Sequence, residues 1–438
     1  MNKAKLADNN DISGETGLRV LIEAYECSPV REHAPGSAWQ IVSRLARWHE
    51  LWVLTEETQY ADEVRSYLAG DSELQGRLHF SFIPRKEPLP QRHPRPIIPI
   101  RPTLNYRTWL KQALKVARGL HDSVGFDLCH HLRGDSFREP GFLWQLPMPF
   151  VWGPTGGITG VPYRLMRVMD VRSIILHVAR NIITAGQIRY SPTVRRAARR
   201  SACILAQSPF DQRKFHNIHG VDALVLHEQA ADPSRAALHD YDGHRALKVV
   251  WAGQCVARKG IPLLLRAVAI ARSKGRIELH LVGDGPLHHA WQTEALRLGI
   301  GNQCVWHGWL SQERTLDVMR ECDVLAFPSL LEATSTTTMQ ALSLGLPVIA
   351  LKVCGLEDMV DESCGFSIPV GCVPSVIDRL AAALVQLLED PKNVTRLSQG
   401  ACRRAHERSW DQLAIFIDRV YRKAVSSNTR TVRGEIVS

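Results

Sequence analysis

The sequence lacks the features of a membrane-spanning, secreted or metal-binding protein. It has no run of about 18 apolar residues, and residues 1–17 are polar, so we expect neither a membrane span nor a secretion signal. Its ten cysteines include no C-x-x-C pair, which indicates reduced thiols rather than disulfides or zinc ligands. No D-x-D motif lies at a predicted strand end, and histidines and aspartates are not grouped at ligand spacing, so we expect no metal site. These absences together predict a cytoplasmic protein.

Acidic residues are scarce in one segment, and the net positive charge of the chain gathers there. The net charge is +10, and residues 101–200 hold 16 Lys and Arg against 5 Asp and Glu. Within this segment, residues 161–200 alternate apolar clusters with arginines, as in a helix that lies on an anionic lipid surface. An amphipathic helix with a solvated arginine face fits the same pattern, whereas no recognisable nucleic-acid-binding motif is present. The arginines concerned are Arg164, Arg167, Arg172, Arg180, Arg189, Arg195, Arg196, Arg199 and Arg200.

The remaining pattern predicts two domains of the same type. The chain has 438 residues of which 45% are hydrophobic, enough for two separate cores. Strand and helix signals alternate from Arg19, and a second alternating series begins at Leu247. Such alternation indicates parallel sheets covered on both faces. The predicted fold is therefore α/β, with two doubly wound, Rossmann-like domains that face a central cleft.

Composition also predicts where the domains begin and end. In the first domain, the prolines and glycine of residues 25–37 indicate a long loop before a helix at 38–49. Polar segments indicate a linker between the two domains and, at each end of the chain, a segment that packs into neither hydrophobic core. The predicted parts are a disordered N-terminus at 1–17, a first domain at 18–228, a linker at 229–245, a second domain at 246–408, a helix at 409–425 and a tail at 426–438.

The most informative segment is residues 323–351, in which a buried strand leads through a polar turn into a helix and a second strand. The turn carries one carboxylate, Glu332, and the helix is expected to begin at Thr336. A helix N-terminus offers free N–H donors and about half a positive charge, which favour a phosphate group. Gln340 follows Glu332 by eight residues, so both side chains can face one cleft.

This segment resembles the E-x7-E motif of the retaining family 4 glycosyltransferases, which have the GT-B fold, with Gln340 in place of the second Glu. The first half of the chain matches more loosely and looks like a bacterial polysaccharide-assembly branch of that family. The matching stretches are IEAYECSPVREHAPGSAW at 22–39, FVWGPTGG at 150–157, VVWAGQCVARKG at 249–260, LVGDGP at 281–286, VWHGWL at 305–310 and PVIA at 347–350.

The resemblance implies a donor site on the second domain. Glu332 aligns with the Glu that contacts the transferred sugar, and Gln340 with the Glu that holds the nucleotide ribose. Lys259 would hold the diphosphate, while Gln254 replaces a family Arg for which Arg258 could substitute. Glu332 and Lys259 are the predicted catalytic residues. The full predicted donor set is Gly36, Gln254, Arg258, Lys259, Glu332, Thr334, Ser335, Thr336 and Gln340.

Without the resemblance, the same residues have ordinary explanations. Arg258 and Lys259 would be solvated cations on a surface turn, Glu332 a helix N-terminal acid stabilised by the dipole, and Gln340 an exposed helix position.

On the acceptor side, the resemblance points to Gly156 and Gly157 of the GPTGG sequence and to the histidine pair at 130–131.

The histidine pair, His130 and His131, follows a predicted strand. Many relatives carry a sugar-contacting histidine in this region, but a structural role is equally compatible with either residue.

The resemblance implies transfer of a hexosyl unit from a UDP- or GDP-sugar to a lipid-linked glycan intermediate in bacterial polysaccharide synthesis. The enzyme would lie at the inner face of the membrane and would need no metal or other cofactor, because Lys259 and helix dipoles would stabilise the departing nucleoside diphosphate. Two alternatives remain open. One is a catalytically degenerate family member that binds a sugar nucleotide or a partner protein. The other is a GT-B sugar-nucleotide epimerase, which would use paired acids and no lipid.

Overall fold

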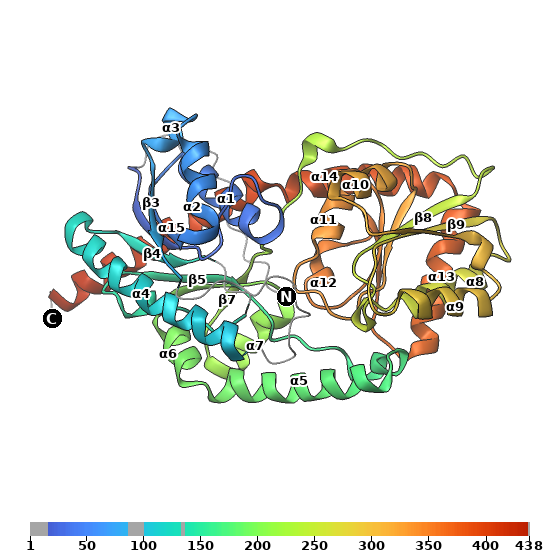
Figure 1. Ribbon diagram of the computed structural model, residues 1–438, viewed down its shortest axis with the longest axis horizontal. Coiled ribbons are helices and arrows are strands. Elements are labelled where there is room, and N and C mark those ends of the chain that lie inside the picture. The colour runs from blue at the N-terminus through green and yellow to red at the C-terminus, as the bar shows by residue number, and fades with distance from the viewer. Residues whose placement is uncertain (1–15, 86–99, 133–135, 437–438) are drawn as a thin grey trace.

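The computed structural model describes residues 16–85, 100–132 and 136–436, which form two parallel sheets flanked by helices (Figure 1). The predicted α/β fold with two doubly wound halves is confirmed. Almost all of the predicted disordered N-terminus lies outside the described residues. The boundary at 229–245 stays a prediction, and it falls between the last strand of one sheet and the first strand of the other.

The first sheet has seven strands in the order β3-β2-β1-β4-β5-β6-β7, all paired in parallel. Its central strands are almost continuously apolar because helices cover both faces. The strands are β1 Arg19–Glu23, β2 Glu50–Glu56, β3 Leu78–Ile83, β4 Leu128–His131, β5 Phe150–Thr155, β6 Ser201–Ala206 and β7 Ala223–Val225. The helices are α1 His33–Leu45, α2 Glu57–Leu68, α3 Ser72–Gln75, α4 Ile100–Val124, α5 Val171–Tyr190, α6 Pro192–Arg200 and α7 Pro209–His219.

The second sheet has six strands in the order β10-β9-β8-β11-β12-β13, again all parallel. Its strands are β8 Leu247–Ala252, β9 Ile277–Val282, β10 Cys304–Gly308, β11 Val324–Phe327, β12 Val348–Leu351 and β13 Gly365–Ile368. The helices that follow are α8 Ile261–Ala271, α9 His288–Arg297, α10 Gln312–Arg320, α11 Thr336–Ser343, α12 Leu356–Met359, α13 Val373–Glu389, α14 Lys392–Glu407 and α15 Trp410–Ile436.

Two predictions about local structure were wrong. The expected loop to residue 37 is interrupted because α1 already begins at His33, with Pro35 and Gly36 in its first turn. Proline is tolerated there because the first N–H groups of a helix have no intrahelical partner. The expected tail at 426–438 is also mostly helical, since α15 continues to Ile436.

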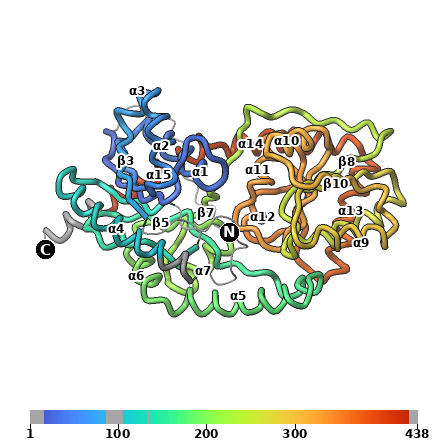
Figure 2. Tube along the Cα trace, in the orientation of Figure 1, coloured from blue at the N-terminus to red at the C-terminus, as the bar shows by residue number. Residues whose placement is uncertain are grey.

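Two segments cross between the halves in opposite directions. We call residues 161–190 the crossing arm, and it comprises a 3-10 helix at Tyr163–Val168 and α5. The arm buries Val161, Leu165, Met166 and Met169 in the core of the second half. α5 then runs beneath both halves, as Figures 1 and 2 show.

The return crossing is α15, which leaves α14 and packs into the first half (Figure 2). Its apolar face, which includes Leu413, Ile417 and Tyr421, is part of the same buried cluster as Val20 and Ile22 of β1. Each half therefore completes its core with residues that are encoded next to the other half.

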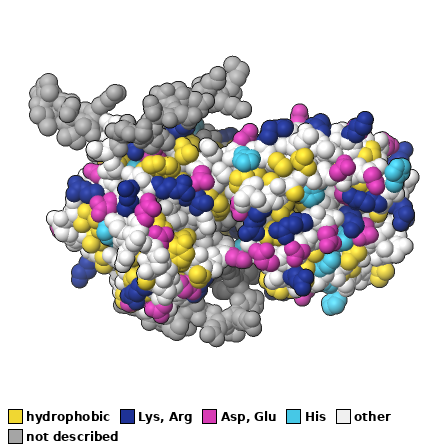
Figure 3. All heavy atoms as spheres, turned by 90° about the horizontal axis from the view of Figure 1, so that it is seen from above, with side chains coloured by type: hydrophobic (Ala, Val, Ile, Leu, Met, Phe, Trp, Pro, Cys, Tyr) yellow, Lys and Arg dark blue, Asp and Glu magenta, His cyan; other side chains and the backbone are white. Residues whose placement is uncertain are grey.

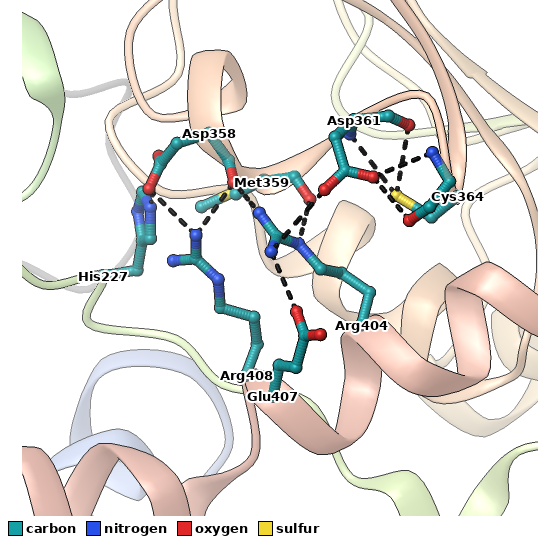
Figure 4. A network of polar contacts seen from close by, with 9 residues as sticks. His227, Asp358, Met359, Asp361, Cys364, Arg404, Glu407 and Arg408 are labelled. Carbon is teal, nitrogen blue, oxygen red and sulfur yellow. Dashed lines mark hydrogen bonds and ion pairs between the residues drawn. The ribbon is translucent and has the colours of Figure 1, made fainter. Parts of the chain in front are cut away.

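A polar network fixes the junction between the halves (Figure 4). His227, just after β7, donates from Nε2 to Asp358 Oδ1 of α12 at 2.8 Å. Arg408 Nη2 donates to Asp358 Oδ2 at 3.0 Å, and Arg404 donates to the backbone oxygen of Asp358. Burial alone would raise the pKa of Asp358, but the hydrogen bond from His227 and the charge of Arg408 lower it. The carboxylate thus stays ionised between its two partners.

The molecular surface seen from above carries positive and negative side chains in mixture over both halves (Figure 3). This face lies opposite α5, which runs along the lower edge in Figure 1. The positive charge of residues 161–200 therefore does not gather on the face in that view.

Candidate functional site

The predicted catalytic residues Lys259 and Glu332 meet in the second half of the molecule. They follow β8 and β11, two neighbouring parallel strands, so their loops lie at the same carboxyl edge of the sheet. Lys259 Nζ donates to Glu332 Oε1 at 2.5 Å, and both side chains are almost fully buried. Arg258 Nη1 and Ser329 Oγ donate to the same carboxylate oxygen, each at 2.8 Å. One carboxylate is thereby shared by two cations.

The two loops fit together because their backbones approach closely. Gly260 has a φ of +65°, and a Cβ there would lie 2.3 Å from the Pro328 oxygen, so only glycine fits without displacement. The Leu330 amide donates to the Arg258 oxygen at 2.8 Å and joins the loops further. The sequence thus positions the ion cluster through backbone contacts as well as through charge.

Burial and charge act in opposite directions on this cluster. Burial lowers the pKa of Lys259, although the Glu332 carboxylate counteracts this. Burial alone would raise the pKa of Glu332, but the charges of Lys259 and Arg258 outweigh it and lower the pKa. With Arg258 included, the cluster carries a net positive charge, which favours an anionic ligand.

Other predicted donor residues line a separate cavity of about 530 Å³ between the two halves. Gly36 enters it from α1, while Thr336 and Gln340 enter it from α11. Neither Lys259 nor Glu332 lines this cavity. The structure therefore divides the predicted donor set into a buried ion cluster and a polar cavity.

The last members of that set have different surroundings. Ser335 caps α11, because its Oγ accepts from the Thr338 amide at 3.0 Å. Thr334 Oγ1 is buried and has no hydrogen-bond partner among the described residues. Gln254 is exposed. Only Thr334 of these three keeps a buried hydroxyl available for a ligand.

On the acceptor side, the geometry gives His130 a structural role. The ring is fully buried, with Nε2 2.6 Å from the Gly153 oxygen and Nδ1 2.6 Å from Tyr421 Oη. A carbonyl oxygen can only accept, so Nε2 carries the proton and Tyr421 donates to Nδ1. Burial lowers the pKa of His130 to about 3. The ring is therefore neutral, and both nitrogens are already bonded within the protein.

His131 is held differently, at the end of β4 beside the end of β1. Its Nδ1 is paired with Glu23, and its Nε2 is buried without a partner among the described residues. Gly156 packs against a side chain, because a Cβ there would lie 2.1 Å from Gln207 Oε1. Gly157 has a φ of +79°, which glycine adopts readily.

Asp211, at the start of α7, is not among the site residues predicted from the sequence. The side chain is fully buried, its Oδ1 accepts from Thr159 Oγ1 at 3.0 Å, and its Oδ2 has no partner among the described residues. Its charge acts on Cys354, a residue of the second half. The Ser208-x-x-Asp211 spacing is a helix-start signal that could have placed this carboxylate at the sheet edge.

We predict that Asp211 makes stability depend on pH. Burial raises the pKa of Asp211 from 3.8 to about 6, so the folded state binds its proton more tightly. The stability contributed by this proton is present below pH 3.8 and is lost as the pH rises through about 6. Asp211→Asn should therefore be more stable than the wild type above that pH, by on the order of 1–3 kcal/mol.

Urea unfolding of both proteins at pH 5 and pH 8 measures this difference. Asp222→Asn is the matched control, because that carboxylate is exposed near the end of the same helix. A pH dependence in Asp211→Asn equal to that of the wild type would contradict the assignment.

Comparisons with known proteins show what the chain is similar to. Residues 244–404 match the family model of glycosyl transferases group 1. An MMP alpha-(1->4)-mannosyltransferase from Mycolicibacterium hassiacum is 33% identical over 176 residues, which are 39% of this chain and 41% of that relative. The chain thus spans less than half the length of this curated relative.

Solved structures resemble almost the whole chain. A sucrose-phosphate synthase from Thermosynechococcus elongatus has a TM-score of 0.59 at 16% identity, covering 94% of this chain and all of that one. HepE from Anabaena, in complex with UDP, has a TM-score of 0.57 at 16% identity, covering 92% of this chain and 99% of that one. Residues 244–404 are thus similar to group 1 of the glycosyl transferases, and the two halves of the chain together have the GT-B fold.

Proposed function

We propose that the protein is a retaining glycosyltransferase that moves a hexosyl unit from a UDP- or GDP-sugar to a lipid-linked glycan in bacterial polysaccharide synthesis. The observation that carries this proposal is the cluster of buried Lys259 and Glu332 with the partly exposed Arg258 at the carboxyl edge of the second sheet. It combines an excess of positive charge with one carboxylate, as the binding of a sugar joined to a diphosphate requires.

In this proposal the donor rearranges the cluster when it binds. The diphosphate takes over the hydrogen bonds of Lys259 and Arg258, and the Glu332 carboxylate is freed to accept hydroxyl groups of the sugar. As the glycosidic bond breaks, the two cations stabilise the charge that develops on the leaving phosphate. Attack occurs on the leaving-group face of an oxocarbenium-like sugar, so a second carboxylate is not needed.

Gln340 provides a test of the donor site. It is proposed to contact the nucleotide ribose from α11, where an amide offers one acceptor and one donor but a carboxylate accepts two hydroxyls. We expect Gln340→Glu to tighten nucleotide binding about fivefold and Gln340→Ala to weaken it, because hydrogen bonds to a charged group are stronger. Titration calorimetry with UDP and GDP measures both changes. Weaker binding in Gln340→Glu than in the wild type would refute the ribose contact.

The activity itself is tested with sugar nucleotides and acceptor together. The relative HepE was solved with UDP, which supports testing UDP-sugars first. A donor that binds should raise the melting temperature of the protein. Free UDP or GDP should then be released only when an acceptor is present. Donor binding without release would instead support a catalytically degenerate binding protein, an alternative that the exposed, uncharged Gln254 favours.

The proposed lipid-linked acceptor places the enzyme on a membrane surface. No helix within the described ranges is long and apolar enough to cross a bilayer. α5, however, exposes the large apolar side chains Val171, Ile175, Ile182 and Tyr190, and α6 begins two residues after α5 ends. An exposed apolar stripe beside a basic helix suits an anionic lipid surface.

Neutralising the basic face of α6 tests the membrane proposal. Arg195, Arg196, Arg199 and Arg200 are all exposed. Each is expected to contribute about 1 kcal/mol to binding, so replacing all four with glutamine should weaken co-sedimentation with anionic vesicles at least about a hundredfold. Vesicles of neutral lipid are the control, because they lack this attraction. Unchanged sedimentation of the variant with anionic vesicles would remove the membrane from the proposal.

A further inference from the structure

A second group of cations lies on the inner face of the crossing arm. Arg180 is on α5 one turn before Thr184, and Thr184 is buried. Arg138 Nη2 donates to Thr184 Oγ1 at 2.6 Å and Nη1 donates to Ser136 Oγ at 2.9 Å. The guanidinium of Arg138 also lies 4.8 Å from the centre of the Phe137 ring. Arg138 is thus held by neutral groups, and one of them, Thr184, lies one turn from Arg180 on α5.

Arg180 connects this group to the donor cluster. Burial lowers the pKa of Arg180, and the charge of Arg258 lowers it further. Burial likewise lowers the pKa of Arg138, and there the second cause is the charge of Arg180. Arg138 is bonded to Thr184, one turn from Arg180 on α5, so these influences agree with a series of three arginines that runs from the first half, through α5, to the second half. Because α5 passes beneath both halves, the series spans the junction between them (Figure 1).

Within the described part of the chain, carboxylates do not neutralise these cations. Among the described residues, neither Arg138 nor Arg180 forms an ion pair with a carboxylate, and Glu332 is already shared by Arg258 and Lys259. Partly buried cations that repel one another are unfavourable unless an anion joins them. Two further polar atoms of α5 are buried without a partner in the described part of the chain, namely His177 Nδ1 and Asn181 Oδ1.

The donor diphosphate is assigned to Lys259 and Arg258, which leaves the two arginines on the first-half side without an anion. We propose that Arg138 and Arg180 bind a phosphate group of the acceptor. This inference rests on the proposed transferase function and specifies it: the acceptor is a phosphorylated molecule, and its phosphate is held on α5 opposite the donor. From the sequence, Arg180 is one of the arginines of the basic segment 161–200, but in the structure its side chain is partly buried and the charge of Arg258 lowers its pKa.

The competing source of the anion is the donor's own diphosphate, so the experiment separates the two. Binding of inorganic pyrophosphate is measured by calorimetry in the presence of saturating UDP or GDP, whichever nucleotide binds. The variants are Arg180→Gln, Arg138→Gln and the control Arg118→Gln, an exposed arginine on α4. Melting temperatures without ligand check that each variant is folded. Arg180→Gln removes no hydrogen bond found in the described residues and is expected to fold.

We expect pyrophosphate to bind beside the nucleotide, at least tenfold more weakly in Arg180→Gln and Arg138→Gln and unchanged in Arg118→Gln, with the nucleotide affinity the same in all. Pyrophosphate that competes with the nucleotide, together with weaker nucleotide binding in Arg180→Gln, would assign the arginines to the donor and overturn the proposal. Absence of pyrophosphate binding to the nucleotide complex would also overturn it.

If the proposed transferase function is wrong, a different result is expected: no sugar nucleotide binds the wild-type protein. Pyrophosphate alone is then titrated into Lys259→Met and Arg138→Gln. Loss of binding only in Arg138→Gln would support the anion site independently, and loss only in Lys259→Met would reject it.

Discussion

Replacing Lys259 with methionine is expected to lower turnover at least about tenfold, because a charged contact to the leaving phosphate is lost. The same change leaves the buried Glu332 carboxylate with Arg258 as its remaining cationic partner. Removing one partner of a buried ion pair typically lowers the free energy of unfolding by about 3–5 kcal/mol. Because Arg258 still pairs with Glu332, we expect a loss near the lower end of this range. Turnover of donor and acceptor, together with urea unfolding, measures the two effects separately.

A second substitution distinguishes catalysis from stability. Glu332→Gln in the Lys259→Met background removes the carboxylate charge that Lys259 no longer balances, so most of the lost stability should return while turnover stays low. Glu332→Gln alone should also reduce turnover at least about tenfold, through weaker contacts to the sugar. Near-normal turnover in both single variants would show that the cluster is structural and that the active site lies elsewhere.

Replacing Tyr421 with alanine is expected to destabilise the first half severely. The side chain comes from α15 but is fully buried in the first half, where its hydroxyl donates to His130. Loss of a large buried aromatic costs about 3–5 kcal/mol, and His130 Nδ1 would in addition lose its partner. Urea unfolding of the whole chain measures the loss.

Tyr421→Phe is the matched control, since it removes only the hydroxyl. It should cost about 1–3 kcal/mol, the usual consequence of an unsatisfied buried polar group. A loss below about 1 kcal/mol in Tyr421→Ala would mean that α15 is not needed for the core of the first half.

The architecture could be predicted from the sequence, for physical reasons. Strands covered on both faces are almost entirely apolar, and helices between them are amphipathic, so both sheets could be recognised from pattern alone. Lys259 and Glu332 lie in turns after neighbouring strands, and parallel topology necessarily brings such turns to one edge. Their direct contact therefore follows from the strand order.

The orientation of single side chains and their hydrogen-bond partners could not be predicted in the same way. Arg180 belongs to a basic segment, but the composition of a segment does not reveal which arginine points inward; only the buried residues one and two turns later, Thr184 and Ile188, indicate that face. His130 was a plausible ligand residue by position, yet its second partner is Tyr421, which is 291 residues away in the sequence. Pro35 and Gly36 suggested a loop because their helix-breaking effect is weak only in the first turn.

The return crossing of α15 has a consequence for how the chain is made. The first half is synthesised before the second, but the surface that receives Leu413, Ile417 and Tyr421 stays uncovered until α15 has left the ribosome. Domains generally fold in the order of their synthesis, and exposed apolar surface promotes aggregation meanwhile. In this protein the half that is translated earlier therefore completes its core only after the other half has been synthesised.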